Sequence, residues 1–283
     1  MTSVHTPTEH RAIHLDHPGG VVQLVQITDC HLGHSQGSTL LGMDTDHSLQ
    51  AVINLVMQER EHTDFILGTG DLSDHGANAA YGRLYQYFGQ ICETSFWLPG
   101  NHDTWGDMSA ESGPNLQLSN DISIGNWQIL MMDTQIPGEI GGELGADQLA
   151  LLDDCLARAG ERGLHTLICL HHQPVAIGSA WLDRQMVADA PEFFALLDRH
   201  SCVRAVLWGH IHQQFEGQHN GIPLLATPST CVQFAPGLAD FKVDDQPPGY
   251  RWLDLHPDGS LTTGVSRVQN VSFTVELDSD GYL

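Results

Sequence analysis

Histidine, aspartate and asparagine residues follow five separate apolar segments of this sequence. Imidazole and carboxylate groups together bind iron, manganese, zinc or cobalt, whereas a site for magnesium alone rarely uses several histidines. The residue types therefore predict a site for such metal ions, provided that the fold brings the five groups together. The groups are Asp29-Cys30-His31, Gly70-Asp71, Gly100-Asn101-His102-Asp103, His171-His172 and Gly209-His210-Ile211-His212.

Each group stands where a predicted strand ends, and most of these strands are separated by predicted helices. In open α/β sheets, ligands bind beyond the carboxyl ends of the strands. We therefore expect the five groups to meet at that edge. Residue patterns predict strands at 21–28, 64–69, 95–99, 165–170 and 203–208, and helices at 46–60, 77–91, 145–163 and 190–200.

Some local details of these elements are specific enough to check. Asp46 is expected to cap the first helix, and Tyr85 is expected to face inward from the second. Residues 121–134 are typical of a hairpin that turns at Gly125-Asn126. A second hairpin is predicted within 250–268, with Pro-Asp-Gly as its turn.

The order of elements predicts one α/β sandwich with two sheets, since strands alternate with helices and hairpins follow. A polar lead over residues 1–19 is expected to be flexible, and a tail over 270–283 is expected to be loosely held. Residues 20–269 would then form a single domain. The chain of 283 residues is long enough for a sizeable core, and it has no evident internal repeat or linker.

Two of the groups place potential ligands at alternate positions. Alternate side chains project the same way from an extended segment. Asp29 with His31, and His210 with His212, are therefore each expected to reach one centre, while Cys30 points away from the metals. The glycines that precede three of the groups let the backbone pass close to the ions.

The formal net charge is −24, and Lys242 is the only lysine of the sequence. Nucleic acids and anionic membranes are held chiefly through lysine and arginine, so neither is expected as a partner. The acid-rich, lysine-poor composition has two interpretations. It reflects either life at high salt, which screens self-repulsion, or simply an acidic cytosolic protein.

Nothing in the sequence indicates export or insertion into a membrane. No segment approaches the roughly 20 apolar residues of a membrane span, and the first twenty residues lack the apolar core of a signal peptide. The six cysteines form no CxxC pair and are expected to be reduced. We therefore expect a cytoplasmic protein. The sequence leaves the oligomeric state open, a homodimer included.

The five groups resemble the metal motifs of the calcineurin-like metallophosphoesterases, which read D-x-H, G-D, G-N-H-D, H and G-H-x-H. Further stretches between Val21 and Val268 resemble the bacterial 3',5'-cyclic-AMP phosphodiesterases of the CpdA type. The narrower signals among them are LLGMDT, SAWLD and ATPSTCVQF. This resemblance implies a four-layer αββα metallophosphoesterase sandwich, in which helices flank two mixed β-sheets.

The resemblance also implies a binuclear metal centre. The ions would be iron or manganese in the first place, with zinc and cobalt as alternatives, and a hydroxide held between them would attack phosphorus in line with the leaving oxygen. One ion would be held by Asp29, His31 and His212, the other by Asn101, His171 and His210, and Asp71 would bridge both.

By the same resemblance, His102 is a catalytic group rather than a ligand. It would protonate the leaving oxygen or stabilise the phosphoryl oxygens, and Asp103 would orient it. His31, Asn101 and His212 are expected to contact the substrate together with His102.

Asp74, His172 and Asp133 have two open interpretations. Histidines that bind a metal usually donate their other ring nitrogen to a neighbouring group, and these three residues could support the ligands in this way. They could equally be ordinary structural polar residues.

Two further sets of residues are also ambiguous. Trp181 either stacks on a base or packs in the core. Thr227, Ser229 and Thr230 either line the pocket or form a plain β-turn.

The resemblance predicts an enzyme that hydrolyses 3',5'-cyclic AMP to 5'-AMP. An alternative keeps the metal site and changes the substrate to 2',3'-cyclic nucleotides or other small phosphodiesters, which the metal motifs do not distinguish. A non-catalytic binding module on the same fold would be expected to have lost ligands, and this sequence keeps all seven. A nuclease is disfavoured, because the chain is acidic and lacks a basic patch.

Overall fold

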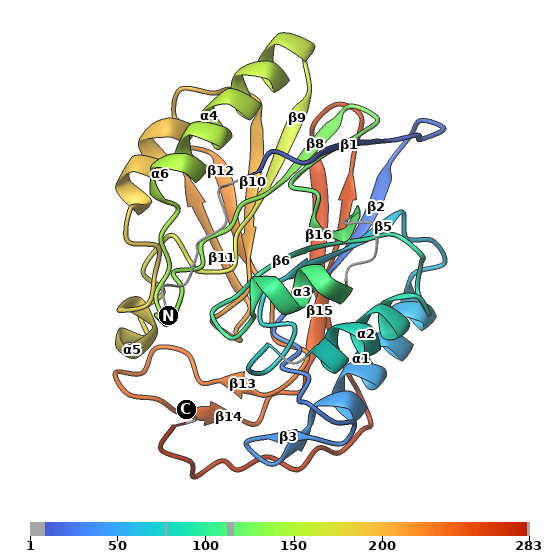
Figure 1. The fold of residues 1–283 in the computed structure, drawn as a ribbon, viewed down its shortest axis with the longest axis vertical. Coiled ribbons are helices and arrows are strands. Elements are labelled where there is room, and N and C mark those ends of the chain that lie inside the picture. The colour runs from blue at the N-terminus through green and yellow to red at the C-terminus, as the bar shows by residue number, and fades with distance from the viewer. Residues whose placement is uncertain (1–8, 77, 112–115, 282–283) are drawn as a thin grey trace.

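Two β-sheets pack face to face in the computed structural model, and helices cover the outer face of each sheet (Figure 1). The structure describes residues 9–76, 78–111 and 116–281. Both sheets contain parallel and antiparallel neighbours. The prediction of a four-layer αββα sandwich with two mixed sheets is therefore confirmed.

The larger sheet has a parallel centre, and antiparallel pairs lie towards both of its sides. Its seven strands are, from one edge to the other, β1 (Ala12–Leu15), β7 (Asp121–Ile124), β8 (Trp127–Met131), β9 (His165–Cys169), β10 (Val203–Trp208), β12 (Ile222–Ala226) and β11 (Phe215–His219).

The smaller sheet has three parallel strands beside an antiparallel hairpin. Its strands are, in spatial order, β16 (Leu261–Arg267), β15 (Gly249–Leu255), β2 (Val22–Ile27), β5 (Phe65–Thr69) and β6 (Ser95–Leu98). Two short ladders lie apart from the sheets: β3 (Thr39–Leu40) with β4 (Met43–Asp44), and β13 (Gln233–Phe234) with β14 (Val243–Asp244).

One pair of helices covers each sheet. Helices α4 (Gly145–Arg162) and α6 (Ala190–Leu197) lie on the larger sheet, and α1 (Thr45–Glu59) and α2 (Asn78–Phe88) lie on the smaller one (Figure 1). The shorter helices are α3 (Trp105–Glu111), α5 (Ala180–Asp183) and the 3₁₀ turn Leu116–Leu118. None of the helices that the structure describes is long and apolar enough to cross a bilayer.

Three apolar clusters fill the interfaces between the four layers. In β2, Leu24 lies between the sheets, whereas its neighbour Val25 packs beneath α1 and α2. In β9, Leu167 faces the other sheet and Ile168 faces α4 and α6. Successive side chains point to opposite faces of a strand, so strands covered on both sides are apolar at nearly every position.

The start of α1 differs from the prediction. Its N-cap is Asp44, whose carboxylate accepts a hydrogen bond from the backbone N–H of His47 at 2.9 Å. Asp46 is buried and instead accepts hydrogen bonds from Arg83 Nε and the Tyr87 hydroxyl, each at 3.0 Å. The prediction of Asp46 as the cap is wrong, because its side chain ties α1 to α2.

The inward face of α2 is narrower than predicted. Tyr81, Leu84 and Phe88 are buried, whereas Tyr85 is 47% exposed. The three buried residues form a stripe on the helix, and Tyr85 lies at its margin. The prediction that Tyr85 faces inward is therefore wrong. Ala77, the first residue of the predicted helix, lies outside the described residues.

Both ends of the chain are held more closely than predicted. Strand β1 pairs in parallel with β7, so residues 12–15 of the predicted flexible lead belong to the larger sheet. In the predicted tail, Phe273 packs against two apolar clusters, and the backbone N–H of Glu276 donates to Leu41 O at 2.8 Å. These contacts come from distant segments, so local composition does not reveal them. The first eight and last two residues lie outside the described residues.

Both predicted hairpins are confirmed. Strands β7 and β8 pair antiparallel, with Ile124 opposite Trp127. Gly125 has a φ of 53°, which a two-residue hairpin turn needs and which glycine adopts without strain. Strands β15 and β16 form the second hairpin.

Candidate metal centre and active site

The seven predicted ligands lie in loops at the carboxyl ends of strands from both sheets. Asp29 and His31 follow β2, Asp71 follows β5 and Asn101 follows β6, all in the smaller sheet. His171 follows β9, and His210 and His212 follow β10, in the larger sheet. The site thus lies where the carboxyl edges of two facing sheets meet, rather than along one edge.

The backbone of these loops is strongly turned. Five of the seven predicted ligands have φ angles between 45° and 64°, a region in which non-glycine residues are strained by about 1–3 kcal/mol each. The prediction of extended segments with alternating side chains is therefore wrong for Asp29 to His31 and for His210 to His212. The residues with positive φ are Asp29, His31, Asp71, His210 and His212.

The first cluster of potential ligands contains Asp29, His31 and His212, all buried. His212 Nε2 lies 3.2 Å from His31 Nε2 and 3.4 Å from Asp29 Oδ1. His212 Nδ1 lies 2.8 Å from Val232 O and donates its proton there, so the Nε2 lone pair points at the other two groups. Lone pairs that converge at this distance repel each other unless a cation lies among them, which is the arrangement that a metal ion fits.

The second cluster contains Asn101, His171 and His210. Asn101 Oδ1 lies 3.2 Å from His171 Nε2 and 3.1 Å from His210 Nδ1. His171 Nδ1 lies 2.9 Å from Thr69 O, and His210 Nε2 lies 3.0 Å from Gln185 Oε1. Each histidine thus donates one ring nitrogen to a neighbour and turns the other towards Asn101, as metal-binding histidines do.

Asp71 lies between the two clusters. Its Oδ2 is 3.3 Å from His171 Nε2 and 3.7 Å from His31 Nε2. Its Oδ1 accepts a hydrogen bond from the backbone N–H of His102 at 2.8 Å. One carboxylate oxygen therefore faces both clusters, and the other is fixed by the loop that carries Asn101 and His102.

Metal binding needs neutral imidazole and ionised carboxylate. His31, His210 and Asp71 meet this need, whereas His171 must release a proton to bind an ion. Burial, reinforced by His102, lowers the pKa of His31 to about 3, and burial together with His172 lowers the pKa of His210. For His171, burial is outweighed by Asp71, which raises the pKa to about 9. The same attraction from His171 overcomes burial and lowers the pKa of Asp71. Asp71 is thus ionised and attracts positive charge to the centre.

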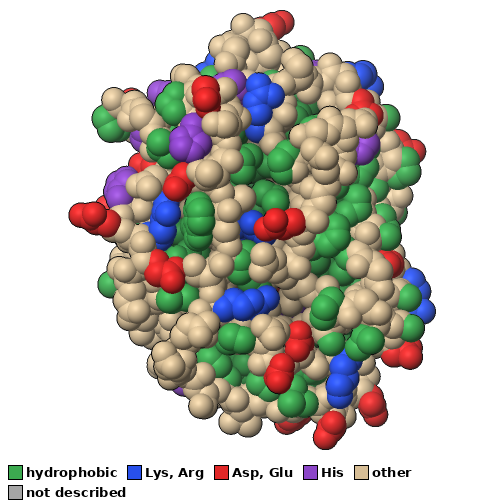
Figure 2. Space-filling model, turned by 180° about the vertical axis from the view of Figure 1, so that it is seen from behind, with side chains coloured by type: hydrophobic (Ala, Val, Ile, Leu, Met, Phe, Trp, Pro, Cys, Tyr) green, Lys and Arg blue, Asp and Glu red, His purple; other side chains and the backbone are tan. Residues whose placement is uncertain are grey.

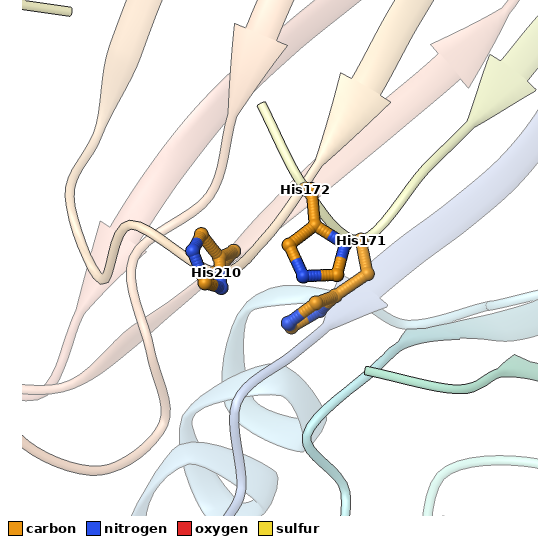
Figure 3. Close-up of side chains that lie close together, drawn as sticks. All are labelled: His171, His172 and His210. Carbon is orange, nitrogen blue, oxygen red and sulfur yellow. The ribbon is translucent and has the colours of Figure 1, made fainter. Parts of the chain in front are cut away.

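His172 lies beside the cluster without facing Asn101. Its Nδ1 is 2.8 Å from Thr134 Oγ1, and its Nε2 is 3.1 Å from Ile140 O. Figure 3 shows its ring packed against the rings of His171 and His210, with centroids 4.8 and 4.6 Å away. Burial, helped by His171, lowers its pKa to about 3. Both ring nitrogens of His172 are thus hydrogen-bonded within the protein, although its ring also groups with His171 and His210 as a possible metal-binding set.

The partner of His102 differs from the prediction. His102 Nδ1 lies 3.2 Å from Asp74 Oδ1. Asp103 instead accepts hydrogen bonds from the backbone N–H groups of residues 72, 73 and 100 and from the Tyr81 hydroxyl. The prediction that Asp103 orients His102 is wrong, because its four acceptor positions hold the loop together. Burial lowers the pKa of His102, but Asp71 and Asp74 outweigh it and raise the value to about 9.

Two glycines are required because the ligands crowd against them. A Cβ on Gly100 would lie 2.2 Å from Asp71 Oδ1, and one on Gly209 would lie 2.6 Å from Asp29 Oδ2. Contacts this short cannot be accommodated without moving the ligands. These glycines therefore make room for ligand side chains.

The residues with open interpretations lie as follows. Ser229 is buried and its hydroxyl donates to Asp29 O at 2.7 Å, and the backbone N–H of Thr230 donates to Thr28 O at 3.2 Å. Thr227 Oγ1 is hydrogen-bonded to Gln26. Residues 227–230 therefore support the loop that carries Asp29 through hydrogen bonds to the end of β2 and to that loop.

Three other residues can be placed in the same way. Trp181 packs against Phe234 and Phe241, with ring centroids 5.1 and 5.2 Å apart. Cys30 is buried in the apolar cluster under α1 and α2. Asp133 accepts a hydrogen bond from the backbone N–H of Gln135 and lines the cavity described next.

A cavity of about 720 Å³ adjoins the centre. Asn101 is the only predicted ligand in its wall, and it is joined there by His102. Trp105 of α3 also lines the cavity, together with Arg11 from the N-terminal segment. The cavity thus extends from the predicted catalytic histidine away from the two ligand clusters.

Two residues that were not predicted from the sequence, Gln185 and Gln135, support the site. Gln185 orients His210, and Gln135 Nε2 donates to Gly100 O at 2.7 Å and to Asp103 O at 2.6 Å. Both glutamines lie in irregular segments, far in the sequence from the loops they support. A glutamine in such a segment carries no pattern that would have revealed these contacts.

Comparison with known proteins places the chain in a family. Residues 22–214 match the family described as calcineurin-like phosphoesterase. The chain belongs to this family and is a metal-dependent phosphoesterase, as the resemblance predicts.

Named relatives cover nearly the whole chain. A 3',5'-cyclic adenosine monophosphate phosphodiesterase CpdA of Pseudomonas aeruginosa is 45% identical over 92% of this chain and 95% of its own length. The protein of the same name from Escherichia coli K12 is 41% identical over 92% and 95%. The fold is shared with a dimetal phosphatase of Danio rerio, at a TM-score of 0.58 and 14% identity, over 89% of this chain and 100% of that one. The predicted similarity to the CpdA type is therefore confirmed.

Proposed function

We propose that this protein hydrolyses 3',5'-cyclic AMP to 5'-AMP at a binuclear metal centre. The observation that carries the proposal is Asp71, whose carboxylate oxygen faces both ligand clusters at 3.3 and 3.7 Å. The names of relatives that are 41–45% identical support cyclic AMP as the substrate.

The residues of the centre bind the ions, and some of them also contact the substrate. Two bound ions supply an activated water and offset the negative charge that develops on the phosphoryl oxygens. Asp29, His31 and His212 would hold one ion, Asn101, His171 and His210 would hold the other, and the Asp71 carboxylate, which faces both clusters, would contribute to both sites. His31, Asn101 and His212 also border the position of the phosphoryl group.

His102 donates a proton to the leaving oxygen. Asp74 fixes the ring through Nδ1, which leaves Nε2 as the nitrogen that reaches the substrate. The backbone N–H of His102 is anchored on Asp71, so the acid is placed relative to the metal-binding carboxylate. Such placement is the main requirement for a general acid.

We propose iron or manganese as the metals. The donor set consists of four imidazoles, two carboxylates and one amide oxygen, with no thiolate, which suits these ions and also zinc or cobalt. Elemental analysis of protein isolated without added metal distinguishes the four.

We propose a cytoplasmic location. All six cysteines are free, as in a reducing compartment.

Acidic side chains are spread over the face seen in Figure 2, interspersed with basic and apolar ones. Dications bound at the centre would attract a small anionic substrate locally, despite the net charge of −24.

The proposed substrate is tested with four compounds under one metal condition. These are 3',5'-cyclic AMP, 2',3'-cyclic AMP, bis(4-nitrophenyl) phosphate and a phosphomonoester, compared by kcat/KM. We expect hydrolysis of the first three and poor hydrolysis of the monoester, whose extra charge and missing second ester arm suit the site less well. Faster cleavage of the monoester than of every diester would overturn the phosphodiesterase assignment. Strong preference for the 2',3' isomer would change the proposed substrate to 2',3'-cyclic nucleotides and leave the proposed mechanism unchanged.

A further inference from the structure

We propose that the cavity beside His102 binds the nucleoside part of the substrate and that Trp105 and Arg11 determine this specificity. The inference rests on the proposed function and names the part of the protein that reads the base. His102 protonates the leaving oxygen, and that oxygen is bonded to the ribose. The nucleoside must therefore extend from His102, and the cavity extends from the same residue.

The position of Arg11 is fixed by contacts on its backbone and its side chain. Its N–H donates to Asn120 Oδ1 at 2.8 Å, and its carbonyl accepts from Asn120 N–H at 3.0 Å. Its guanidinium donates from Nε and Nη2 to Glu9 Oε2 at 3.2 and 3.0 Å. The guanidinium carbon lies 5.7 Å from the centroid of the Trp105 ring. Arg11 and Trp105 therefore form one preformed piece of the cavity wall.

One donor of this arginine is unsatisfied. Arg11 Nη1 is buried and has no hydrogen-bond partner among the residues that the structure describes. A buried donor without a partner is costly, because it has lost its hydration and gained nothing in return. A rotation of the guanidinium that turns Nη1 towards the cavity would let a ring nitrogen of a base or a ribose hydroxyl accept this hydrogen bond.

The charges around the cavity select the chemical class of its ligand. Glu9, Asp103, Asp133 and Glu139 line it, and they outnumber the two cationic groups in its wall, Arg11 and the protonated His102. An excess of carboxylates repels a second phosphate, whereas a neutral nucleoside offers amino and hydroxyl donors that carboxylates accept. The ligand is therefore a cyclic mononucleotide rather than a dinucleotide or a polyphosphate.

The size and the aromatic wall agree with this class. Sites for small molecules commonly enclose about 300–1,000 Å³ and bury most of the ligand. The volume of about 720 Å³ lies within this range. Trp105 is half-buried, packs on the cluster beneath α1 and α2 and has Arg11 over part of its ring, so the exposed remainder of the ring is held rigidly for contact with a base.

The test compares two substrates on the metal-loaded enzyme. We expect Trp105→Ala to raise KM for 3',5'-cyclic AMP about tenfold or more, the scale of a lost base–aromatic stack. Arg11→Gln should raise it about 3- to 10-fold, the scale of a lost hydrogen bond. Both variants should leave kcat within twofold, because neither residue touches the reacting atoms. The loss in kcat/KM should be smaller for bis(4-nitrophenyl) phosphate than for cyclic AMP, because the nitrophenyl leaving group lacks the ribose and the base nitrogens. Trp105→Phe should recover most of the affinity.

Arg60→Gln is the matched control, because Arg60 lies 5.4 Å from the Trp252 ring, outside the cavity wall. It should leave both substrates unchanged. Equal losses on both substrates in Trp105→Ala and Trp105→Phe, or an unchanged KM for cyclic AMP in Trp105→Ala, would overturn the inference.

A second measurement separates this inference from the proposed function. If the wild-type enzyme cleaves the aryl diester but not cyclic AMP, the proposed function fails. In that case cyclic AMP is used as an inhibitor of aryl diester hydrolysis, and its inhibition constant measures its binding to the cavity directly. A rise of that constant in Trp105→Ala supports the cavity as the nucleoside site, and an equal constant contradicts it.

Discussion

The carboxylate of Asp74, and not that of Asp103, lies 3.2 Å from Nδ1 of His102. The two aspartates therefore have separate tasks around the same histidine. Asp74 fixes the ring of His102, while Asp103 accepts four hydrogen bonds from its surroundings and holds the loop. This division of tasks can be tested by substitution.

His102→Ala should retain both metal ions and lower kcat about 10²–10⁴-fold, the usual effect of removing a proton-transfer group. Asp74→Asn should lower kcat less, and it should have no further effect in the His102→Ala background, because it acts only through the ring. The measurement combines kinetics with elemental analysis. His62→Ala is the control, since His62 forms an exposed pair with Asp64 at 3.0 Å. Loss of metal in His102→Ala would reassign His102 as a ligand.

Asp71→Asn should abolish activity and lower the metal content below two ions per chain. The substitution removes the charge that faces both clusters, so both ions lose part of their site. Asp198→Asn, at an exposed aspartate that pairs with His219, should keep activity and metal. A fully active wild-type protein with one metal ion or none would disprove the binuclear centre.

Gln185→Leu should weaken metal binding about 10- to 100-fold, the effect seen when a partner of a metal-binding histidine is removed. The leucine fills a similar volume but cannot accept the hydrogen bond from His210 Nε2. Gln185→Glu keeps an acceptor and should retain the metal. Metal titration into stripped protein measures the difference, with Gln90→Leu as the control, because Gln90 is exposed and pairs with Gln50. Equal affinities in Gln185→Leu and the wild type would show that His210 needs no such support.

The melting temperature should rise with sodium chloride up to about 1 M. At that ionic strength the Debye length falls to about 3 Å, which screens the repulsion among carboxylates at a net charge of −24. Each kcal/mol gained corresponds to about 2–4 °C for a domain of this size. Thermal scans in sodium chloride, with an uncharged solute at matched osmolality as control, measure the effect. A flat or falling curve would leave only the interpretation of an acidic protein without adaptation to salt.

The sequence by itself determined the fold class and the residues that gather at the site. Apolar runs marked most of the main strands, and the polar groups behind them marked the carboxyl ends where ligands collect. The predicted ligands and His102 do lie together, because alternation of strands and helices leaves few ways to arrange them. The hairpin at Gly125 could also be predicted from the sequence, because two adjacent residues, Gly125 and Asn126, form its turn.

The tertiary structure decided which side chain serves which partner. His210 and His212 are two positions apart, yet His210 joins Asn101 and His212 joins Asp29, because positive φ angles turn the loop between them. Asp74 rather than Asp103 holds His102, and Gln185 holds His210. Strand β1 is stabilised by parallel pairing with β7, which lies more than a hundred residues further along the chain. Such choices depend on contacts between residues far apart in the chain, and the free energy of those contacts exists only once the two sheets have packed.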